Sequence, residues 1–514
     1  MKAMNLVNTG YVLDMQCKLY RWSRSNPQQT FRDLFNWVCD RRNLADAWRK
    51  LAGNTGSRTP GIDGRTRRKV EERPGGVHAY LDEVREKLRK GTFAPSPVRQ
   101  KLIPKPGKPG QYRPLGIPTL TDRLVQMALK NVLEPIFEAD FYPTSYGFRR
   151  NRSVHDALAT IQRNLNVTKA GPANVAYVIE GDIKGCFDNI DHHLLMDRVR
   201  RRVADKKVLR LIHAFLKAGV MVEGAFRRTR VGTPQGGIIS PLLANIMLTA
   251  LDERYGRWTP SPHEARINAQ QRRLHAQRKG RPTFFHVRYA DDFVILVSGT
   301  LEDAETEKQR LAAFLREELR LELSAEKTLV TPVEAGFVFL GHRVVVEPSK
   351  RTGVPLGKLF IPKDRLQRVR DRIKSITDRS TTCMSLEGLL RWKLNPVIRG
   401  WKGFYRYATG VSKECSRLDV WVWRKVQRWL RKKHPTRTAQ WVRRRYQRRI
   451  GNRRHWLENG VVLRLFVEGG SARYPVRGFS IRTGWEDTAP PAGLRRTAPG
   501  LENANFERWR GLFT

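Results

Sequence analysis

Helical periodicity covers most of the chain. Apolar residues recur every three to four positions through the first 55 residues, where Trp37, Leu44, Trp48 and Leu51 mark one packed face. The same period predicts helices over residues 77–90, 121–139, 153–165, 193–218 and 301–320, and almost continuously from about 360 to 449. A polar, basic stretch over residues 254–281 predicts a surface insertion made of a loop and a helix.

Shorter apolar runs between these helices predict strands. The runs Phe284–Val287 and Phe293–Val297 flank Tyr289-Ala290-Asp291-Asp292, which predicts a hairpin with two carboxylates at its turn. A third strand is expected to begin at Ala176 and to end in acidic residues, and a fourth to cover residues 336–346.

The chain carries a large positive charge. Its 514 residues are enough for two to four domains, and 97 Lys and Arg against 49 Asp and Glu give a net charge of +48. Such an excess opposes compaction unless a polyanion neutralises it, so nucleic acid is the expected partner. A membrane is not expected, because no apolar run approaches the about 20 residues that span a bilayer. Five scattered cysteines without a C-x-x-C pair are typical of reduced thiols in a cytosol.

The carboxylates of Asp291 and Asp292 point to a metal. Adjacent carboxylates repel each other, and a divalent cation such as Mg²⁺ would neutralise both. A solvated turn is the alternative, since Asp is common in turns. Asp182 supports the metal, because it ends an apolar strand and two-metal phosphoryl transfer needs carboxylates from two elements. Asp188 is interpreted as a cap or strand end, and Asp191 as the N-cap of a helix that begins with the surface residues His192 and His193.

Two further segments could face a nucleotide. Pro95–Pro118 is rich in proline, glycine and basic residues, so it is expected to be exposed and extended, with Lys105 and Arg113 available to phosphate oxygens. The Gly/Pro turn from Val231 to Pro241 exposes backbone, and Gln235 within it could hydrogen-bond a flat ligand. Taken alone, the basic segment is better explained as a solvated loop, and the turn is only weak evidence for a nucleotide site.

The stretch from Arg417 to Arg454 is different in kind, because it holds 15 Lys and Arg against the single acid Asp419. Tryptophans and tyrosine interleave with these cations, a pattern that suits backbone neutralisation and base stacking, although several of the aromatics are expected to form a helical core. The residues that we expect to bind nucleic acid are Arg424, Lys425, Arg428, Arg431, Arg443, Arg444, Arg445 and Arg448.

Seven motifs follow one another in a fixed order. They are Ile103-Pro104-Lys105…Arg113-Pro114-Leu115, Ser145-Tyr146-Gly147-Phe148-Arg149, Asp182-Ile183-Lys184-Gly185…Phe187-Asp188, Thr233-Pro234-Gln235-Gly236-Gly237, Tyr289-Ala290-Asp291-Asp292, Leu323-Ser324-Ala325-Glu326-Lys327 and Phe339-Leu340-Gly341-His342. The segments Arg391-Trp392 and Gly400–Tyr407 follow. In this order they resemble the reverse transcriptases encoded by bacterial group II introns, over about residues 60 to 450, with the last segments similar to the family's maturase region.

The resemblance implies a role for each matching residue. Asp182, Asp291 and Asp292 would hold two Mg²⁺ ions. Lys105 and Arg113 would contact the incoming triphosphate, Gln235 would touch the nucleotide, and Phe187 would exclude a 2′-hydroxyl. Cys186 stands where an aromatic residue is expected and His342 where phenylalanine is expected. No cysteine follows Cys415, and residues 456–514 show no metal-ligand cluster, so no endonuclease domain is expected.

The resemblance also implies the architecture: an α+β right-hand polymerase with fingers, palm and a helical thumb. The expected divisions are an N-terminal helical extension (1–95), fingers (96–175), a palm that carries the acid hairpin (176–346), a thumb or maturase domain (347–455) and a basic C-terminal extension that could bind DNA (456–514).

The expected function is RNA-directed DNA synthesis by two-metal nucleotidyl transfer, together with binding of the intron RNA to assist splicing and support intron mobility. Its partners would be group II intron RNA, target DNA and primer, and deoxynucleoside triphosphates, in a ribonucleoprotein of the bacterial cytoplasm. Two alternatives stay open: a reverse transcriptase recruited to host defence, and an RNA-binding splicing factor without a polymerase role.

Overall fold

A computed structural model describes residues 2–104, 110–166, 175–222, 225–227, 232, 236–264, 266–478 and 480–486. These residues form two compact units. The first unit takes the described residues up to 161, those between 174 and 331, and those from 477 onward; the second takes the described residues from 162 to 173 and from 332 to 476. The division at 331 falls inside the range predicted for the palm.

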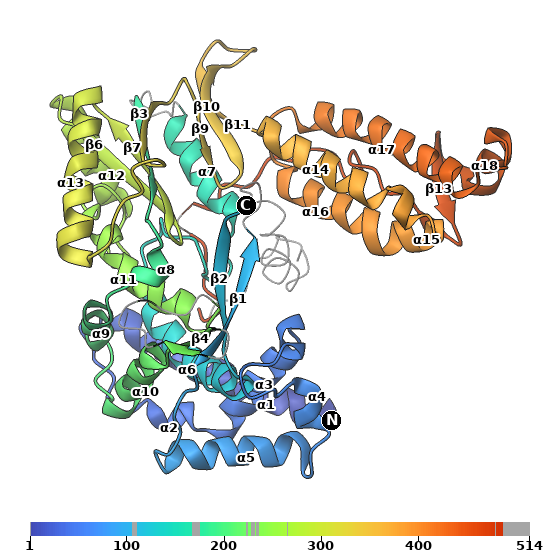
Figure 1. Cartoon of the computed structure of the whole chain (residues 1–514). Coiled ribbons are helices and arrows are strands. Elements are labelled where there is room, and N and C mark those ends of the chain that lie inside the picture. The colour runs from blue at the N-terminus through green and yellow to red at the C-terminus, as the bar shows by residue number, and fades with distance from the viewer. Residues whose placement is uncertain are drawn as a thin grey trace. The chain divides into compact units, whose positions relative to one another are not determined.

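The first unit contains two four-stranded sheets (Figure 1). The sheet with the acid hairpin has the order β6-β7-β3-β8, and the other has the order β2-β1-β4-β5. Their strands are β1 (Val98–Pro104), β2 (Tyr112–Ile117), β3 (Tyr177–Asp182), β4 (Val220–Val222), β5 (Ala225–Arg227), β6 (Thr283–Tyr289), β7 (Asp292–Ser298) and β8 (Leu329–Pro332). The predicted acid hairpin is thereby confirmed as β6–β7. The segment expected only to be exposed and extended pairs with itself as the β1–β2 hairpin, and Lys101 to Pro104 on it are exposed.

Helices make up the rest of the first unit: α1 (Lys2–Ser25), α2 (Phe35–Val38), α3 (Arg41–Ala52), η1 (Thr55–Arg58), α4 (Arg67–Glu71), α5 (Gly76–Arg89), α6 (Leu120–Glu138), α8 (Cys186–Asn189), α9 (His192–Arg200), α10 (Lys206–Lys217), α11 (Ser240–Arg254), α12 (Arg266–Arg278) and α13 (Leu301–Leu319). Helix α7 (Val154–Leu165) belongs to both units. Helices α6 and α11 are buried on nearly every face.

The helix expected over 193–218 is two helices, and Asp205 is the reason. Its carboxylate accepts hydrogen bonds from the amides of Lys207 and Val208 and so starts α10 as an N-cap. The second oxygen accepts from the amides of Leu34 and Phe35. Four backbone donors satisfied by one buried carboxylate favour a break over a continuous helix.

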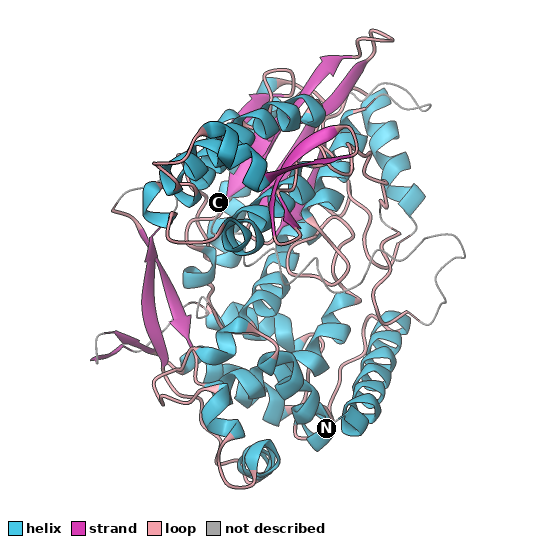
Figure 2. Ribbon diagram, turned by 90° about the vertical axis from the view of Figure 1, so that its right-hand side faces the viewer, coloured by secondary structure: helices cyan, strands magenta, loops and turns pink. Residues whose placement is uncertain are grey.

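The second unit begins with the sheet β11-β10-β9, made of β9 (Phe337–Phe339), β10 (His342–Pro348) and β11 (Pro355–Phe360). The strand expected over 336–346 is thus a hairpin. Helices make up most of the secondary structure (Figure 2), and they dominate beyond this hairpin: α14 (Lys363–Ile376), η2 (Arg379–Thr381), α15 (Leu386–Leu389), the π-helix η3 (Leu390–Leu394), α16 (Asn395–Tyr405), α17 (Val411–Lys433) and α18 (Ala439–Tyr446). A last sheet has β12 (Gln447–Ile450), β13 (Arg453–Glu458) and β14 (Val461–Val462).

Aromatic residues build the core of the second unit. Trp401, Trp429 and Trp456 are fully buried, and Trp401 lies edge-on to the Phe466 ring at 5.3 Å between centroids. His342 is also buried, and its ring packs at a tilt against those of Phe404 and Tyr405, with 5.1 and 5.0 Å between centroids. An imidazole that packs against aromatic rings as a flat side chain explains why this chain accepts histidine where phenylalanine was expected.

The chain returns to the first unit after residue 476. There Arg477 pairs with Asp156 at 2.6 Å, and the fully buried Trp485 donates its indole N–H to the Oε1 atom of Gln16 at 3.1 Å. The fold is α+β, as predicted. Among the described residues, no helix is both long and apolar enough to cross a membrane.

Candidate active site

Strand register brings the predicted carboxylates together. Asp182, the last residue of β3, is the register partner of Asp292, the first residue of β7. Asp292 also pairs with Tyr289 at the end of β6, so Ala290 and Asp291 alone form the turn. A two-residue turn needs left-handed backbone, and Ala290 supplies it with a φ of 59°. The three carboxylates therefore occupy neighbouring positions at one end of the sheet.

Cys186 senses the negative potential at this end of the sheet. Burial raises the pKa of its thiol most, and the carboxylate of Asp291 raises it further, followed by Asp182 and Asp188; Arg288 acts in the opposite direction. A thiolate is disfavoured by nearby negative charge, so the raised pKa of Cys186 reflects the negative potential of these carboxylates. A cation would be attracted to the same place.

Lys327 supplies a positive charge to this site. Its Nζ atom donates to Oδ2 of Asp182 at 2.6 Å, and its side chain is 55% exposed. The backbone aligns the pair, because the amide of Ser324 donates to the carbonyl oxygen of Asp182 at 2.8 Å and Leu323 bridges Ile183. Sequence reasoning assigned Lys327 no role in the site, since nothing local links it to a residue 145 positions earlier. An exposed ammonium can exchange for a metal ion at little cost.

The donor set fits a hard divalent cation. Asp182, Asp291 and Asp292 offer oxygen ligands, which Mg²⁺ prefers, and all three are partly exposed. Among the described residues, no three His, Cys, Asp or Glu side chains are already gathered for a metal. That is compatible with Mg²⁺, which usually takes one or two carboxylates and completes its shell with water and substrate phosphates.

The residues expected to contact the nucleotide are only partly described. Arg113 lies on β2 and is exposed, as required for a phosphate contact. Lys105 and Gln235 lie outside the described residues. Gly236, which follows Gln235, lies so close to β2 that a Cβ atom there would come within 2.4 Å of the carbonyl oxygen of Gly116. Gly236 and the strand that carries Arg113 are therefore neighbours.

Phe187 lies on α8, five residues beyond Asp182 in the chain, and is half-buried. Its ring meets that of Phe148 edge-on, with 6.2 Å between centroids. Phe148 comes from the second of the seven motifs, so two motifs far apart in the chain meet at this ring. The contact gives Phe187 a fixed orientation, which a steric gate would require.

Of the four predictions for the residues after Phe187, two are confirmed and two are wrong. Asp191 caps α9 through the amides of His193 and Leu194 at 2.9 and 3.0 Å, as predicted. Asp188 lies inside the short helix α8, so it is neither a cap nor a strand end. His192 is buried and hydrogen-bonded to the carbonyl oxygen of Gly232 at 2.7 Å, so the prediction of a surface residue was wrong for it, whereas His193 is exposed.

The residues expected to bind nucleic acid lie in the second unit. Arg424, Arg428 and Arg431 are exposed on α17, and Lys425 is half-buried over the ring of Trp421. Exposed arginines continue on α18 and β12, at Arg443, Arg444, Arg445 and Arg448. The opposite faces of α17 and α18 bury Trp429 and Tyr446. The cations and the core aromatics thus separate onto different faces, as expected from the sequence.

Known proteins match both units. Residues 103–344 match the family model for reverse transcriptase (RNA-dependent DNA polymerase), and residues 366–447 match the maturase-specific domain of group II introns.

Protein YkfC of Escherichia coli K12 is 38% identical over 352 residues, which are 66% of this chain and 90% of that protein. The group II intron-encoded protein LtrA of Lactococcus lactis is 36% identical over 382 residues, which are 64% of this chain and 60% of LtrA. The nuclear intron maturase 2 of Arabidopsis thaliana is 26% identical over 306 residues, 47% of this chain and 40% of that protein. The chain thus spans less than two thirds of LtrA.

Proposed function

This chain belongs to the group II intron-encoded reverse transcriptases with a maturase-specific domain, and on that premise we propose that it extends a primer by two-metal nucleotidyl transfer at Asp182, Asp291 and Asp292 while its second unit binds intron RNA. The register pairing of Asp182 with Asp292, beside the turn that holds Asp291, is the observation that carries the proposal. It places oxygen ligands from two strands at one point of the sheet, as two-metal chemistry requires.

Each residue of the site has a task in this proposal. The three aspartates hold Mg²⁺, which when bound lowers the pKa of the primer 3′-hydroxyl and stabilises the leaving oxygen. Arg113 and Lys105 bind the triphosphate, and Gln235 orients the nucleotide. Lys327 keeps Asp182 charge-balanced until the metal arrives. The ring of Phe187 excludes a ribose 2′-hydroxyl and so selects deoxynucleotides.

The second unit binds the RNA. Exposed arginines on α17, α18 and β12 neutralise phosphates, and the release of condensed counterions drives the association. Binding of this kind would let the protein assist splicing of the intron RNA and bring RNA, target DNA and primer together for intron mobility, in a ribonucleoprotein of the bacterial cytoplasm. A splicing factor without polymerase activity is less well supported, because all three carboxylates are present.

Removal of one metal-binding charge tests the polymerase site. Asp291→Asn and Asp182→Asn keep the side-chain volume and should lower Mg²⁺-dependent primer extension at least about a hundredfold, because a metal contributes several kcal/mol to the transition state. Binding of intron RNA, measured by filter retention, should stay at the wild-type level. Asp197→Asn, on the exposed face of α9, is the matched control. Near wild-type extension by both active-site variants would remove these residues from the metal site.

The sugar gate is tested at Phe187. Phe187→Ala should lower the preference for deoxynucleotides over ribonucleotides by about tenfold or more, because the clash that rejects the 2′-hydroxyl is removed. Single-nucleotide incorporation with each substrate gives the two efficiencies. Phe314→Ala removes a half-buried ring from α13 in the same unit and should leave the preference unchanged. The gate is refuted if Phe187→Ala discriminates as the wild type does.

RNA binding by the second unit is tested by the salt dependence of its affinity. Replacement of Arg443, Arg444 and Arg445 with Gln should weaken RNA binding, and the removal of each arginine–phosphate pair should flatten the log–log salt slope by about 0.7 to 0.9. Arg67→Gln/Arg68→Gln is the control, because those exposed cations already pair with Glu71 and Glu72. An unchanged affinity and slope in the triple variant would show that these arginines form a solvated face.

A further inference from the structure

The turn that carries Asp291 is strained and must be held from outside. Ala290, a residue with a Cβ atom, has a left-handed φ of 59° and is buried. Left-handed backbone costs a non-glycine residue on the order of 1 kcal/mol or more and persists only where the surroundings enforce it. Two sets of contacts converge on this turn, one on its carbonyl and one on its amide.

Arg288 holds the carbonyl side. Its side chain is fully buried, and its Nη1 atom donates to the carbonyl oxygen of Ala290 and to Oδ1 of Asn245, both at 3.0 Å. Its other nitrogens make a bidentate pair with Asp252, at 3.0 and 2.6 Å. Asn245 and Asp252 are seven residues apart on α11 and hence on one face of it. The strained carbonyl is therefore fixed to a buried helix through a rigid guanidinium.

Gly147 holds the amide side. A Cβ atom on Gly147 would lie 2.2 Å from the amide nitrogen of Ala290, so only glycine allows this approach. Asn245 joins the two sides, because its Nδ2 atom donates to the carbonyl oxygen of Gly147 at 2.9 Å. The backbone of Arg288 is also hydrogen-bonded to this segment. Its carbonyl oxygen accepts from the amide of Tyr146 at 2.9 Å, and its amide donates to the carbonyl oxygen of Thr144 at 3.0 Å.

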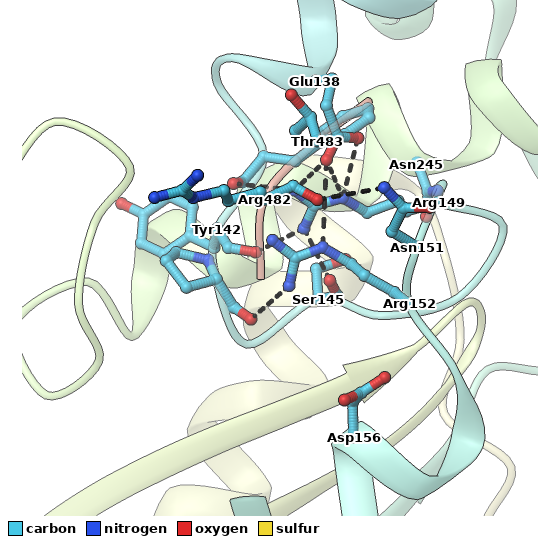
Figure 3. A network of polar contacts seen from close by, with 12 residues as sticks. Glu138, Tyr142, Ser145, Arg149, Asn151, Arg152, Asp156, Asn245, Arg482 and Thr483 are labelled. Atoms are coloured by element: carbon cyan, nitrogen blue, oxygen red, sulfur yellow. Dashed lines mark hydrogen bonds and ion pairs between the residues drawn. The ribbon is translucent and has the colours of Figure 1, made fainter. Parts of the chain in front are cut away.

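The segment around Gly147 is itself held in place by the hydrogen bonds of Arg149, two residues further along the chain (Figure 3). The buried Arg149 donates to Oε1 of Glu138 at 2.7 Å and to the carbonyl oxygens of Tyr142 and Ser145 at 2.7 and 2.6 Å. Glu138 is the last residue of α6, so this segment is anchored on the other helix that is buried on nearly every face. The turn thus stands between two segments fixed to α6 and α11.

The charges around Arg288 balance without help from solvent. One guanidinium faces one carboxylate, that of Asp252, and both are fully buried. The third titratable group is His286, whose Nδ1 atom lies 3.4 Å from Asp252; burial lowers the pKa of His286 to about 4, so the ring is neutral at physiological pH. A balanced, bidentate pair in a dry site holds its geometry, because each partner would be costly to bury alone.

We propose that Arg288, Asp252, Asn245 and Gly147 are positioning residues of the polymerase site, which fix the Ala290–Asp291 turn so that the Asp291 carboxylate faces its metal. The proposal rests on the proposed metal-binding role of Asp291. Asn245 connects the two sets of contacts, because it alone among these side chains hydrogen-bonds both to Arg288 and to the backbone of Gly147.

Asn245→Ala tests this without leaving a charge buried and unpaired. Single-nucleotide addition on a pre-bound primer–template should be about tenfold slower, below the hundredfold that a misplacement of 1 Å can cost. The Mg²⁺ concentration for half-maximal rate should rise several-fold, since a loose Asp291 binds metal more weakly. Asn43→Ala is the matched control: Asn43 is also fully buried and donates to the carbonyl oxygens of Trp37 and Ala128, away from the turn. It should lower the melting temperature to a similar extent and keep the wild-type Mg²⁺ dependence.

Gly147→Ala provides a second route to the same answer if Asn245→Ala does not fold, because the added methyl group displaces the turn directly. Gly403→Ala, with open space around the added atom, is its control. A Mg²⁺ dependence that matches the controls overturns the positioning role, whereas a wild-type protein without Mg²⁺-dependent addition overturns the proposed function itself.

A separate observation concerns Trp392 in the second unit. Its side chain is 71% exposed, more than any other large apolar side chain among the described residues. It lies on the π-helix η3, between Leu390 and Leu394, which are both fully buried and leave Arg391, Trp392 and Lys393 facing outward. Single π-helical turns are rare and occur frequently at functional sites. Arg391 pairs with Glu387 at 3.0 Å, so the exposed indole beside the exposed Lys393 is what matches a nucleobase and its phosphate.

We infer that Trp392 is a stacking platform for an unpaired base of the RNA that the second unit binds, an inference that rests on the proposed RNA binding. Stacking displaces no condensed counterions, so its removal has a signature different from the removal of an arginine. Trp392→Ala should weaken binding of a group II intron transcript about tenfold with an unchanged salt slope. Trp392→Phe should retain most of the affinity.

Two controls make the Trp392 test decisive. Val420→Ala, on an exposed apolar residue of α17, should leave binding unchanged. A fully paired RNA duplex offers no free base and should bind Trp392→Ala as it binds the wild type. Wild-type affinity of Trp392→Ala for the intron transcript, or an equal weakening on the duplex, overturns the stacking role. A wild-type protein without salt-dependent binding of the transcript would instead refute RNA binding as such.

Discussion

Three carboxylates at one end of a sheet repel one another, and much of the first unit is arranged to keep them there. The register of β3 on β7 sets Asp182 beside Asp292. The turn that contains Asp291 is strained at Ala290, and residues outside the turn contact it on both sides: Arg288 at the carbonyl oxygen of Ala290 and Gly147 at its amide. Lys327 pairs with Asp182 and so balances part of the negative charge. Proximity of like charges is thus maintained by a rigid backbone, while the partial exposure of the acids leaves them open to cations.

Arginine has two opposed uses in this chain. In the first unit, Arg149 and Arg288 are buried, and each satisfies a carboxylate and backbone carbonyl oxygens with one planar fork. In the second unit, arginines of α17 and α18 remain exposed, where their charge is available to a polyanion. A lysine could replace the second kind more easily than the first, because an ammonium offers no fixed fork. Cations on α17 and α18 thus lie at the surface, while the buried arginines Arg149 and Arg288 are paired with Glu138 and Asp252.

The sequence predicts what depends on local pattern. The acid hairpin, the helices over 121–139, 153–165 and 301–320, and the helical second unit follow from periodicity, and the structure confirms them. The break at Asp205 could not be predicted, because the donors from Leu34 and Phe35 come from the other end of the unit. His192 and Lys327 were misjudged or missed for the same reason, since their partners are distant in sequence. A signal for Arg288 was present: a cation inside an apolar strand, with Asn245 and Asp252 on one face of an apolar helix, indicates a buried polar partnership.

The chain connects the unit that carries the three carboxylates to the proposed RNA-binding helices α17 and α18. The chain leaves the first unit after residue 331 and returns to it at 477, where Arg477 binds Asp156 and Trp485 is buried against Gln16. Both ends of the long segment of the second unit are therefore anchored in the catalytic unit. A doubly anchored segment explores less space than one with a free end, which raises the effective concentration of whatever it carries. On the proposed function, RNA bound by α17 and α18 is therefore tethered to the unit that carries the carboxylates by two chain connections rather than one.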